Sequence, residues 1–183
     1  MIQWMSPEDY PAVYSILCYY IEHSNANLAW TFPDPTEHFQ MLDDLSEDYP
    51  VLVAKWEEEV IGFGYAHPFL GKESYQFDAE LTIYFKKGDH HHLAKAMARQ
   101  LEVICKAMGI CRLISCTTAD NKASIDYQKR HGFTPFGLLK DAGFKNGKWW
   151  DVAWLEKRIS DTDSPCRIPL KSIRDQISFQ ESR

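Results

Sequence analysis

The spacing of apolar residues along the chain predicts alternating helices and strands. From Tyr10 to about His23, apolar side chains recur every three to four residues behind the start signal Ser6-Pro7, which is typical of a helix with one buried face. Short runs of branched and aromatic residues between turn residues are typical of strands. The predicted helices span residues 6–23, 36–45, 90–108 and 122–131, and the predicted strands span residues 50–55, 60–66, 79–85, 112–117, 133–140 and 148–155.

The order of these elements predicts one mixed α/β domain. Residues 50–55 and 60–66 flank an acidic turn and form an antiparallel hairpin, and a turn region at 143–147 joins the last two strands. The strand–helix–strand unit over residues 79–117 forms a right-handed crossover, so its two strands are parallel and either adjacent or separated by one other strand. We assign residues 1–159 to this domain and the polar, aperiodic residues 160–183 to a C-terminal tail.

Composition narrows the class of protein. The 183 residues are 45% hydrophobic and 25% charged, which is the balance of a globular domain, and the net charge of -6 argues against a general nucleic-acid or anionic-membrane binder. No apolar run reaches the roughly 18 residues that cross a bilayer, and the first residues lack the apolar stretch of a signal peptide. The five cysteines have no CxxC spacing, so we expect reduced thiols and a cytoplasmic location.

Four short motifs occur in order between the second and the last predicted strands. They are Tyr65-Ala66 followed by Phe69, Lys72 and Tyr75, the strand Ala79-Glu80-Leu81-Thr82-Ile83-Tyr84-Phe85, the stretch Asp120-Asn121-Lys122-Ala123-Ser124-Ile125 with Gly132-Phe133, and the segment from Gly143 to Asp151. On these motifs, the chain resembles the GNAT superfamily of acyl-CoA N-acyltransferases over about residues 2–157. More narrowly, it is similar to the phosphinothricin and methionine sulfoximine N-acetyltransferase group.

The resemblance implies both a fold and an activity. The fold is a mixed, mostly antiparallel central sheet with a splayed parallel strand pair, flanked by helices. The activity is transfer of an acetyl group from acetyl-CoA, as co-substrate, to the primary amine of a small amino-acid-like acceptor, in a cytoplasmic homodimer without a metal. Acetyl-CoA would lie between the strands 79–85 and 112–117, with its pyrophosphate at the start of the next helix near His92.

Glu80 is the candidate catalytic residue. From the residues alone, a carboxylate on this strand is most simply a polar group on the solvent face. The resemblance instead implies a general base that takes a proton from the acceptor amine, a role that suits a partly buried carboxylate with a raised pKa. The general acid stays unassigned, because Gln128 stands where many superfamily members have a tyrosine.

The implied cofactor-binding residues lie at a strand end and at two helix starts. Backbone N–H groups at a helix start bind phosphate well, and glycine lets that backbone come close. Here Asp89 stands where the family has Gln or Arg, and His92 stands where it has Gly; Asn121 is also a simple helix cap. The set is Ile83, Tyr84, Phe85, His90, His91, His92, Leu93, Ala94, Lys95, Asn121 and Ser124.

The implied acceptor-binding residues are Trp30, Phe69, Lys72 and Tyr75. Lys72 replaces an arginine of the family, which removes bidentate carboxylate binding and favours a different acceptor. Trp30 is either a wall of the acceptor pocket or ordinary core. The motif residues Lys145, Trp149 and Trp150 either pack at a dimer interface or stabilise the terminal hairpin.

Two other interpretations stay open beside this one, and a metal site is not among them. Consecutive histidines on a helix point about 100° apart, so His90-His91-His92 is not predicted to bind a metal. A GNAT-shaped binding or regulatory module that has lost CoA chemistry is the main alternative, because of His92. Acetylation of a protein or tRNA amine is the other, and the acidic charge disfavours tRNA.

Overall fold

The computed structural model describes residues 1–88 and 90–179, without the side chain of His91. Within these residues, seven strands form one sheet in the order β1-β2-β3-β4-β5-β7-β6. Every neighbouring pair is antiparallel except β4 and β5, which are parallel. The strands are β1 (Ile2–Trp4), β2 (Val51–Trp56), β3 (Glu59–Pro68), β4 (Asp78–Phe85), β5 (Arg112–Thr118), β6 (Thr134–Lys145) and β7 (Lys148–Arg158).

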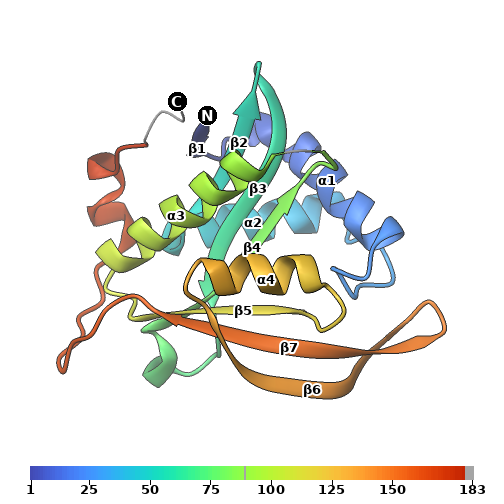
Figure 1. Ribbon diagram of the computed structural model, residues 1–183. Helices are drawn as coiled ribbons and strands as arrows, with labels where there is room; N and C mark the ends of the chain where they lie inside the picture. The colour runs from blue at the N-terminus through green and yellow to red at the C-terminus, as the bar shows by residue number, and fades with distance from the viewer. Residues whose placement is uncertain (89, 180–183) are drawn as a thin grey trace.

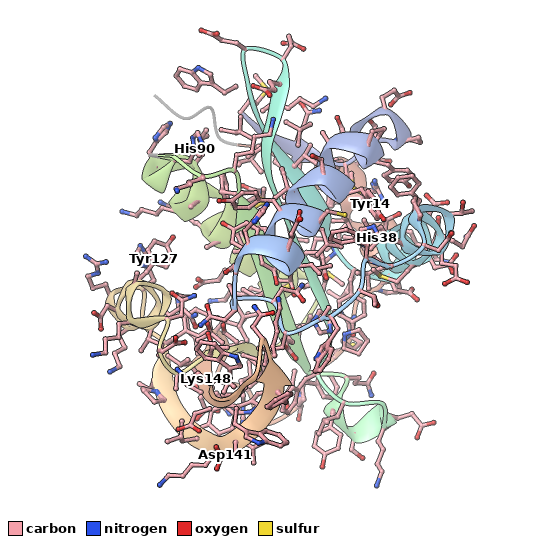
Figure 2. All side chains as sticks on the ribbon, turned by 90° about the vertical axis from the view of Figure 1, so that its right-hand side faces the viewer. Tyr14, His38, His90, Tyr127, Asp141 and Lys148 are labelled. Atoms are coloured by element: carbon pink, nitrogen blue, oxygen red, sulfur yellow. The ribbon has the colours of Figure 1, made fainter. Side chains whose placement is uncertain are left out.

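Helices cover both faces of the sheet (Figure 1). The turned view in Figure 2 also shows helices on either side of the sheet. On one side are α1 (Tyr10–His23) and α2 (Pro35–Asp48), where Tyr14 and His38 meet at a ring distance of 5.9 Å. On the other side are α3 (His91–Ala107) and α4 (Lys122–Arg130). Short 3-10 turns are η1 (Pro7–Asp9), η2 (Glu73–Tyr75), η3 (Leu170–Ser172) and η4 (Arg174–Gln176).

The alternation of side chains along β2 and β3 builds two cores. Val53 and Phe63 lie in the cluster that α1 and α2 bury, whereas Leu52, Ala54 and Ala66 lie in the cluster that α3 buries. Successive residues of a strand point to opposite faces of the sheet, and residues paired across two strands point to the same face. The faces of these residues therefore determine the faces of the residues paired with them on the neighbouring strands. The arrangement confirms the predicted fold class.

The two parallel strands at the centre of the sheet separate soon after they meet. Only three residue pairs join β4 to β5, and the last of them is Glu80 with Ile114. Beyond this pair the strands diverge, which confirms the predicted splay. In the described part of the chain, the β5-facing backbone of residues 81–85 therefore has no strand partner.

The C-terminal segment, residues 160–179, packs on the rest of the protein. Leu170 is 1% exposed and belongs to the core cluster beneath α3. The guanidinium of Arg167 donates to the carbonyl of Met108 at 2.9 Å, and that of Arg174 lies 4.5 Å from the Trp4 ring centroid. The segment is polar in composition, but its few apolar residues pack against the core. The spacing of apolar residues in the sequence does not predict these contacts.

Two local predictions need correction. Strand β1 was not predicted, because three residues are too few to show a period. The last hairpin turns at Asn146 and Gly147 alone, whereas residues 143–145, expected in the turn, continue β6. Both turn residues have positive φ, of 54° and 73°, as a two-residue hairpin turn requires. None of the helices described here has the length and apolar character to cross a membrane.

Candidate active site

The opening between β4 and β5 is the centre of the candidate site. Glu80 sits at its narrow end and is half-buried, on the face that α1 and α2 cover. Burial raises the pKa of the Glu80 carboxyl, and the positive charge that His67 can carry acts against this rise. Glu80 is thus neither a solvent-facing carboxylate nor a paired one.

Polar and aromatic side chains share the face of Glu80. In the register of β3 with β4, His67 is directly opposite Glu80, and Tyr65 is opposite Thr82. Burial raises the pKa of Tyr84 to about 12, so its hydroxyl keeps its proton, and this hydroxyl lies 3.3 Å from Nδ2 of Asn27. These groups form a floor beside Glu80 on the face of the sheet that α1 and α2 cover.

One further group of this floor lies on β5. The side chain of Cys116 is exposed as a whole, but its thiol is partly screened from solvent. This partial burial, together with the negative charge of Glu80, raises the pKa of the thiol to about 11. Sequence reasoning missed Cys116, His67 and Tyr65, because only the strand register brings them to Glu80. The alternation of Phe63, Tyr65 and His67 along β3 is the one signal that could have found two of them.

The start of α3 lies beyond the wide end of the opening. His90 is its N-cap residue and makes no side-chain capping bond, so the first N–H groups of the helix are not satisfied by a cap. The ring of His90 (Figure 2) lies 6.1 Å from that of Phe85, and the ring of His92 lies 6.1 Å from that of Trp56. The two rings thus approach different strands. Asp89 and the His91 side chain lie outside the described residues.

Several predicted cofactor residues have side chains that point into the core. Leu93 is 1% exposed, and Ile83 and Phe85 pack against the same core cluster under α3. They can meet a ligand in the opening only through their backbone. Ala94 is half-buried and Lys95 is exposed on the first turns of α3.

Asn121 and Ser124 lie at the start of α4. The side chain of Asn121 accepts from the N–H of Ser124 at 3.2 Å, so the expected capping bond is present. The hydroxyl of Ser124 accepts from Nε2 of Gln128 at 3.0 Å, while Oε1 of Gln128 and Oη of Tyr127 (Figure 2) are buried without a described partner. This end of α4 therefore has unused hydrogen-bonding capacity.

The loop between α1 and α2 is attached to the rest of the site by a buried lysine. The Lys145 side chain is 4% exposed, and its Nζ donates to the carbonyls of Ile21, Ser24 and Asn27 at 2.6, 2.7 and 2.6 Å. Burial lowers the pKa of Lys145. Its role is thus to cap the end of α1 and to hold the loop that carries Asn27, rather than to form an exposed interface.

The predicted acceptor residues are spread over two regions. Trp30 is 69% exposed, which rules out the core alternative, and its Nε1 donates to the carbonyl of Phe144 at 2.7 Å. Phe69 packs against Trp154 of β7 at a ring distance of 5.7 Å. Lys72 and Tyr75 are exposed at η2, and no described contact joins them to Trp30.

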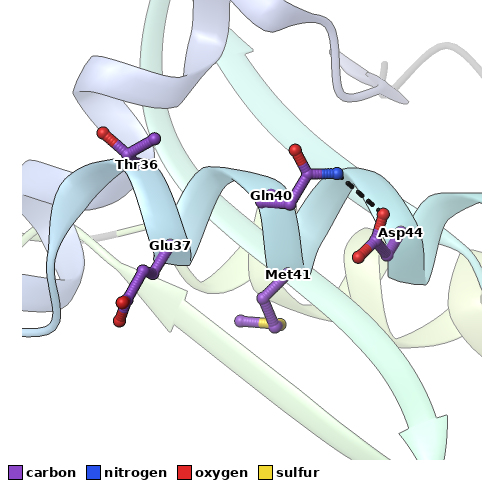
Figure 3. Close-up of a pocket in the computed structure, with 5 residues that line it drawn as sticks. All are labelled: Thr36, Glu37, Gln40, Met41 and Asp44. Carbon is purple, nitrogen blue, oxygen red and sulfur yellow. Dashed lines mark hydrogen bonds between the residues drawn. The ribbon is translucent and has the colours of Figure 1, made fainter.

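Two hollows are present on the described surface. One of about 350 Å³ lies where the loop after α1 meets the β6–β7 turn, and Trp30, Phe32 and Asn146 line part of it. The other, of about 570 Å³, is a shallow depression on the outer face of α2 (Figure 3). Its side chains are exposed and one pair, Gln40 and Asp44, is bonded internally at 2.8 Å, so we assign no site there.

A parted parallel strand pair, a helix start beyond it and a half-buried carboxyl at its narrow end are consistent with an acyl-CoA-dependent acyltransferase. Comparison with protein families agrees, because residues 15–154 match the acetyltransferase (GNAT) domain. The chain belongs to this family and is an acetyl-CoA-dependent N-acetyltransferase, as the sequence predicted.

Individual relatives indicate which acetyltransferases the chain is similar to. The phosphinothricin N-acetyltransferase of Streptomyces viridochromogenes is 31% identical over 153 residues, which is 81% of this chain and 82% of that protein. The L-methionine sulfoximine/L-methionine sulfone acetyltransferase of Pseudomonas aeruginosa is 26% identical over 64% of this chain and 70% of that protein. The phosphinothricin acetyltransferase of Sinorhizobium meliloti, solved with acetyl-CoA, superposes with a TM-score of 0.86 at 26% identity, over 91% of this chain and 92% of that chain.

Proposed function

We propose that this enzyme acetylates the primary amine of a small amino-acid-like acceptor of the phosphinothricin or methionine sulfoximine type. The observation that carries the proposal is the Glu80 carboxyl at the point where β4 and β5 part. Its burial and raised pKa suit a group that accepts a proton from an ammonium near neutral pH. The names of the relatives support the acceptor class.

Acetyl-CoA would lie in the opening between the two strands. The unpaired backbone of Ile83, Tyr84 and Phe85 offers hydrogen bonds to an extended ligand, as a missing strand would. The uncapped start of α3, from His90 to Lys95, offers N–H groups and the positive end of the helix dipole to the pyrophosphate. Asn121 and Ser124 would contact the arm of the ligand from the start of α4.

The reaction needs only groups near Glu80. Glu80 first takes a proton from the acceptor ammonium, and the neutral nitrogen then attacks the thioester carbonyl. A backbone N–H of β4 donates to the oxyanion, the C–S bond breaks, and the second proton leaves the nitrogen and passes through water to the CoA thiolate. Trp30, Phe69, Lys72 and Tyr75 would surround the acceptor from the loops on either side.

We also propose that the enzyme works as a cytoplasmic homodimer. The β6–β7 hairpin exposes large apolar side chains, which single-chain proteins rarely gather on one element. They are Phe136, Leu138, Leu139, Phe144 and Trp149. The five free thiols support a reducing compartment. Light scattering on the eluted protein would test the dimer, and a monomer at micromolar concentration would contradict it.

Thermal unfolding tests whether the His92-bearing loop binds the co-substrate. A ligand at 100 times its dissociation constant stabilises the native state by about 2.7 kcal/mol, or several degrees in melting temperature. Acetyl-CoA is expected to produce this shift, with CoA and ATP as controls. No shift at millimolar acetyl-CoA would favour the alternative of a binding module that has lost CoA chemistry.

A pH–rate profile tests Glu80. Glu80→Gln is expected to lower kcat about 100-fold or more at pH 7, and less at alkaline pH, where the amine is already neutral. The exposed Glu47 of α2 supplies the matched control, Glu47→Gln, which should leave the profile unchanged. Phosphinothricin and methionine sulfoximine are the first acceptors to assay. An unaltered profile in Glu80→Gln would remove Glu80 as the base.

A further inference from the structure

Glu80 has to lose the proton that it accepts before the next turnover. The carboxyl is half-buried, and this burial raises its pKa, so a proton leaves it less readily than it leaves an exposed carboxyl. A neighbouring basic group that reaches solvent would give this proton a route out of the site. The question is which described side chain beside Glu80 can do so.

The titratable groups that face Glu80 come from two strands. On β3 they are Tyr65 and His67, and on β5 there is Cys116. Burial raises the pKa of both Tyr65 and Cys116, so each keeps its own proton at neutral pH and has no vacant site for another. Tyr20 of α1 packs against Tyr84, and its pKa is also raised by burial. Among the described residues, His67 is left.

The placement of His67 suits a proton acceptor. It is paired directly opposite Glu80 in the antiparallel ladder, which brings the Cβ atoms of such a pair to about 5 Å. The Nδ1 atom lies 3.1 Å from the carbonyl oxygen of Pro68. In the tautomer that makes this hydrogen bond, Nδ1 carries the hydrogen and Nε2 of the neutral ring has a free lone pair. The ring is half-exposed at the end of β3, so solvent can reach it.

We propose that His67 accepts at Nε2, through an intervening water, the proton that Glu80 has taken from the acceptor amine, and releases it to solvent. The Glu80 O–H bond breaks, an N–H bond forms on the imidazole, and the resulting imidazolium gives the proton to water. Glu80 returns to the carboxylate that the next ammonium requires. This inference rests on the proposed role of Glu80 and adds a second residue, one that acts through Glu80 without touching the acetyl group.

The test combines kinetics with a titration that needs no turnover. In His67→Gln, kcat is expected to fall about tenfold, which is less than the about 100- to 10,000-fold cost of losing a general base. The acid limb of the kcat/KM profile should move to higher pH, while KM for acetyl-CoA stays unchanged. In His67→Ala, added imidazole should restore part of kcat. The control is His23→Gln, which removes an exposed histidine at the end of α1.

The titration follows the carboxyl ¹³C shift of Glu80 against pH in the wild type and in His67→Gln. We expect the pKa of Glu80 to rise in the variant, because the charge that opposes the burial effect is lost. An unchanged Glu80 titration, or an unchanged kcat with no response to imidazole in His67→Ala, would overturn the proposal. A wild type that acetylates no amine would instead overturn the proposed function, and the titration would still decide whether His67 and Glu80 are paired.

Discussion

Replacing Lys145 by methionine tests how a buried ammonium holds the end of α1. Methionine keeps the length of the side chain but removes the donor to the carbonyls of Ile21, Ser24 and Asn27. The Ile21 carbonyl bond is buried, and the other two are partly buried, so water can replace Nζ only in part. A buried carbonyl without a partner costs about 1 to 3 kcal/mol.

The expected loss in the free energy of unfolding for Lys145→Met is therefore about 3 kcal/mol, with the buried carbonyl as the main cost and the two others adding less. Burying the Lys145 ammonium without a carboxylate itself costs free energy, and the variant no longer pays this cost. This gain offsets part of the summed cost of the three carbonyls that lose their donor. For a chain of this size the melting temperature should fall by about 6 to 12 °C.

Urea unfolding followed by circular dichroism measures this loss, with Lys140→Met as the control. Lys140 is an exposed lysine of the same strand, and its loss should change stability by no more than about 0.5 kcal/mol. Equal midpoints for Lys145→Met and the control, at equal m-values, would refute the reasoning. The loop would then be held by its other contacts alone, such as the Trp30 bond to Phe144.

Three further predictions concern stability. Glu80→Gln should raise the melting temperature at pH 8 and leave it unchanged near pH 4. The reason is that a carboxyl with a raised folded-state pKa destabilises the fold only above its unfolded pKa. A lower melting temperature of the variant at pH 8 would contradict this. Burial acts to raise the pKa of Asp9, but bonds from Lys55 and Ser6 outweigh it, so the pKa lies below its usual value. The stabilisation by Asp9 is therefore present at neutral pH and should decrease progressively below about pH 4. Comparing Asp9→Asn with the wild type at pH 3 and pH 7 measures this, and an equal difference at both values would count against it. Leu170→Ala should cost about 2 to 5 kcal/mol in chemical unfolding, and a cost below about 1 kcal/mol would show that the C-terminal segment is only loosely attached.

Local patterns in the sequence were enough to predict most elements of the fold. The helix from residue 90 and the strand 79–85 were found because their periods of 3.6 and 2 extend over many residues. The three-residue β1 is too short to have a period, and Leu170 is a single apolar residue in a polar segment. Both are stabilised by partners distant in the sequence, which a pattern does not contain.

The residues of the candidate site also fall into two groups, those predicted from local patterns and those that depend on contacts distant in the sequence. The sequence predicts Glu80, Asn121 and Ser124 as site residues because they belong to short motifs. The opposition of His67 to Glu80 depends on the register of two strands, and the bonds of Lys145 to α1 span more than 100 residues. Such contacts follow from the folded geometry, and the residue types alone do not indicate them.

The short ladder between β4 and β5 has a consequence for how the protein is held together. With three residue pairs across that joint, the sheet is in effect two half-sheets, β1 to β4 and β5 with β7 and β6. The C-terminal segment leaves the second half-sheet at the end of β7 and returns to Trp4 in the first. It therefore connects the two halves behind the opening. The joint would otherwise be a line along which the two half-sheets separate, and residues 160–179 supply a cross-connection that limits this separation.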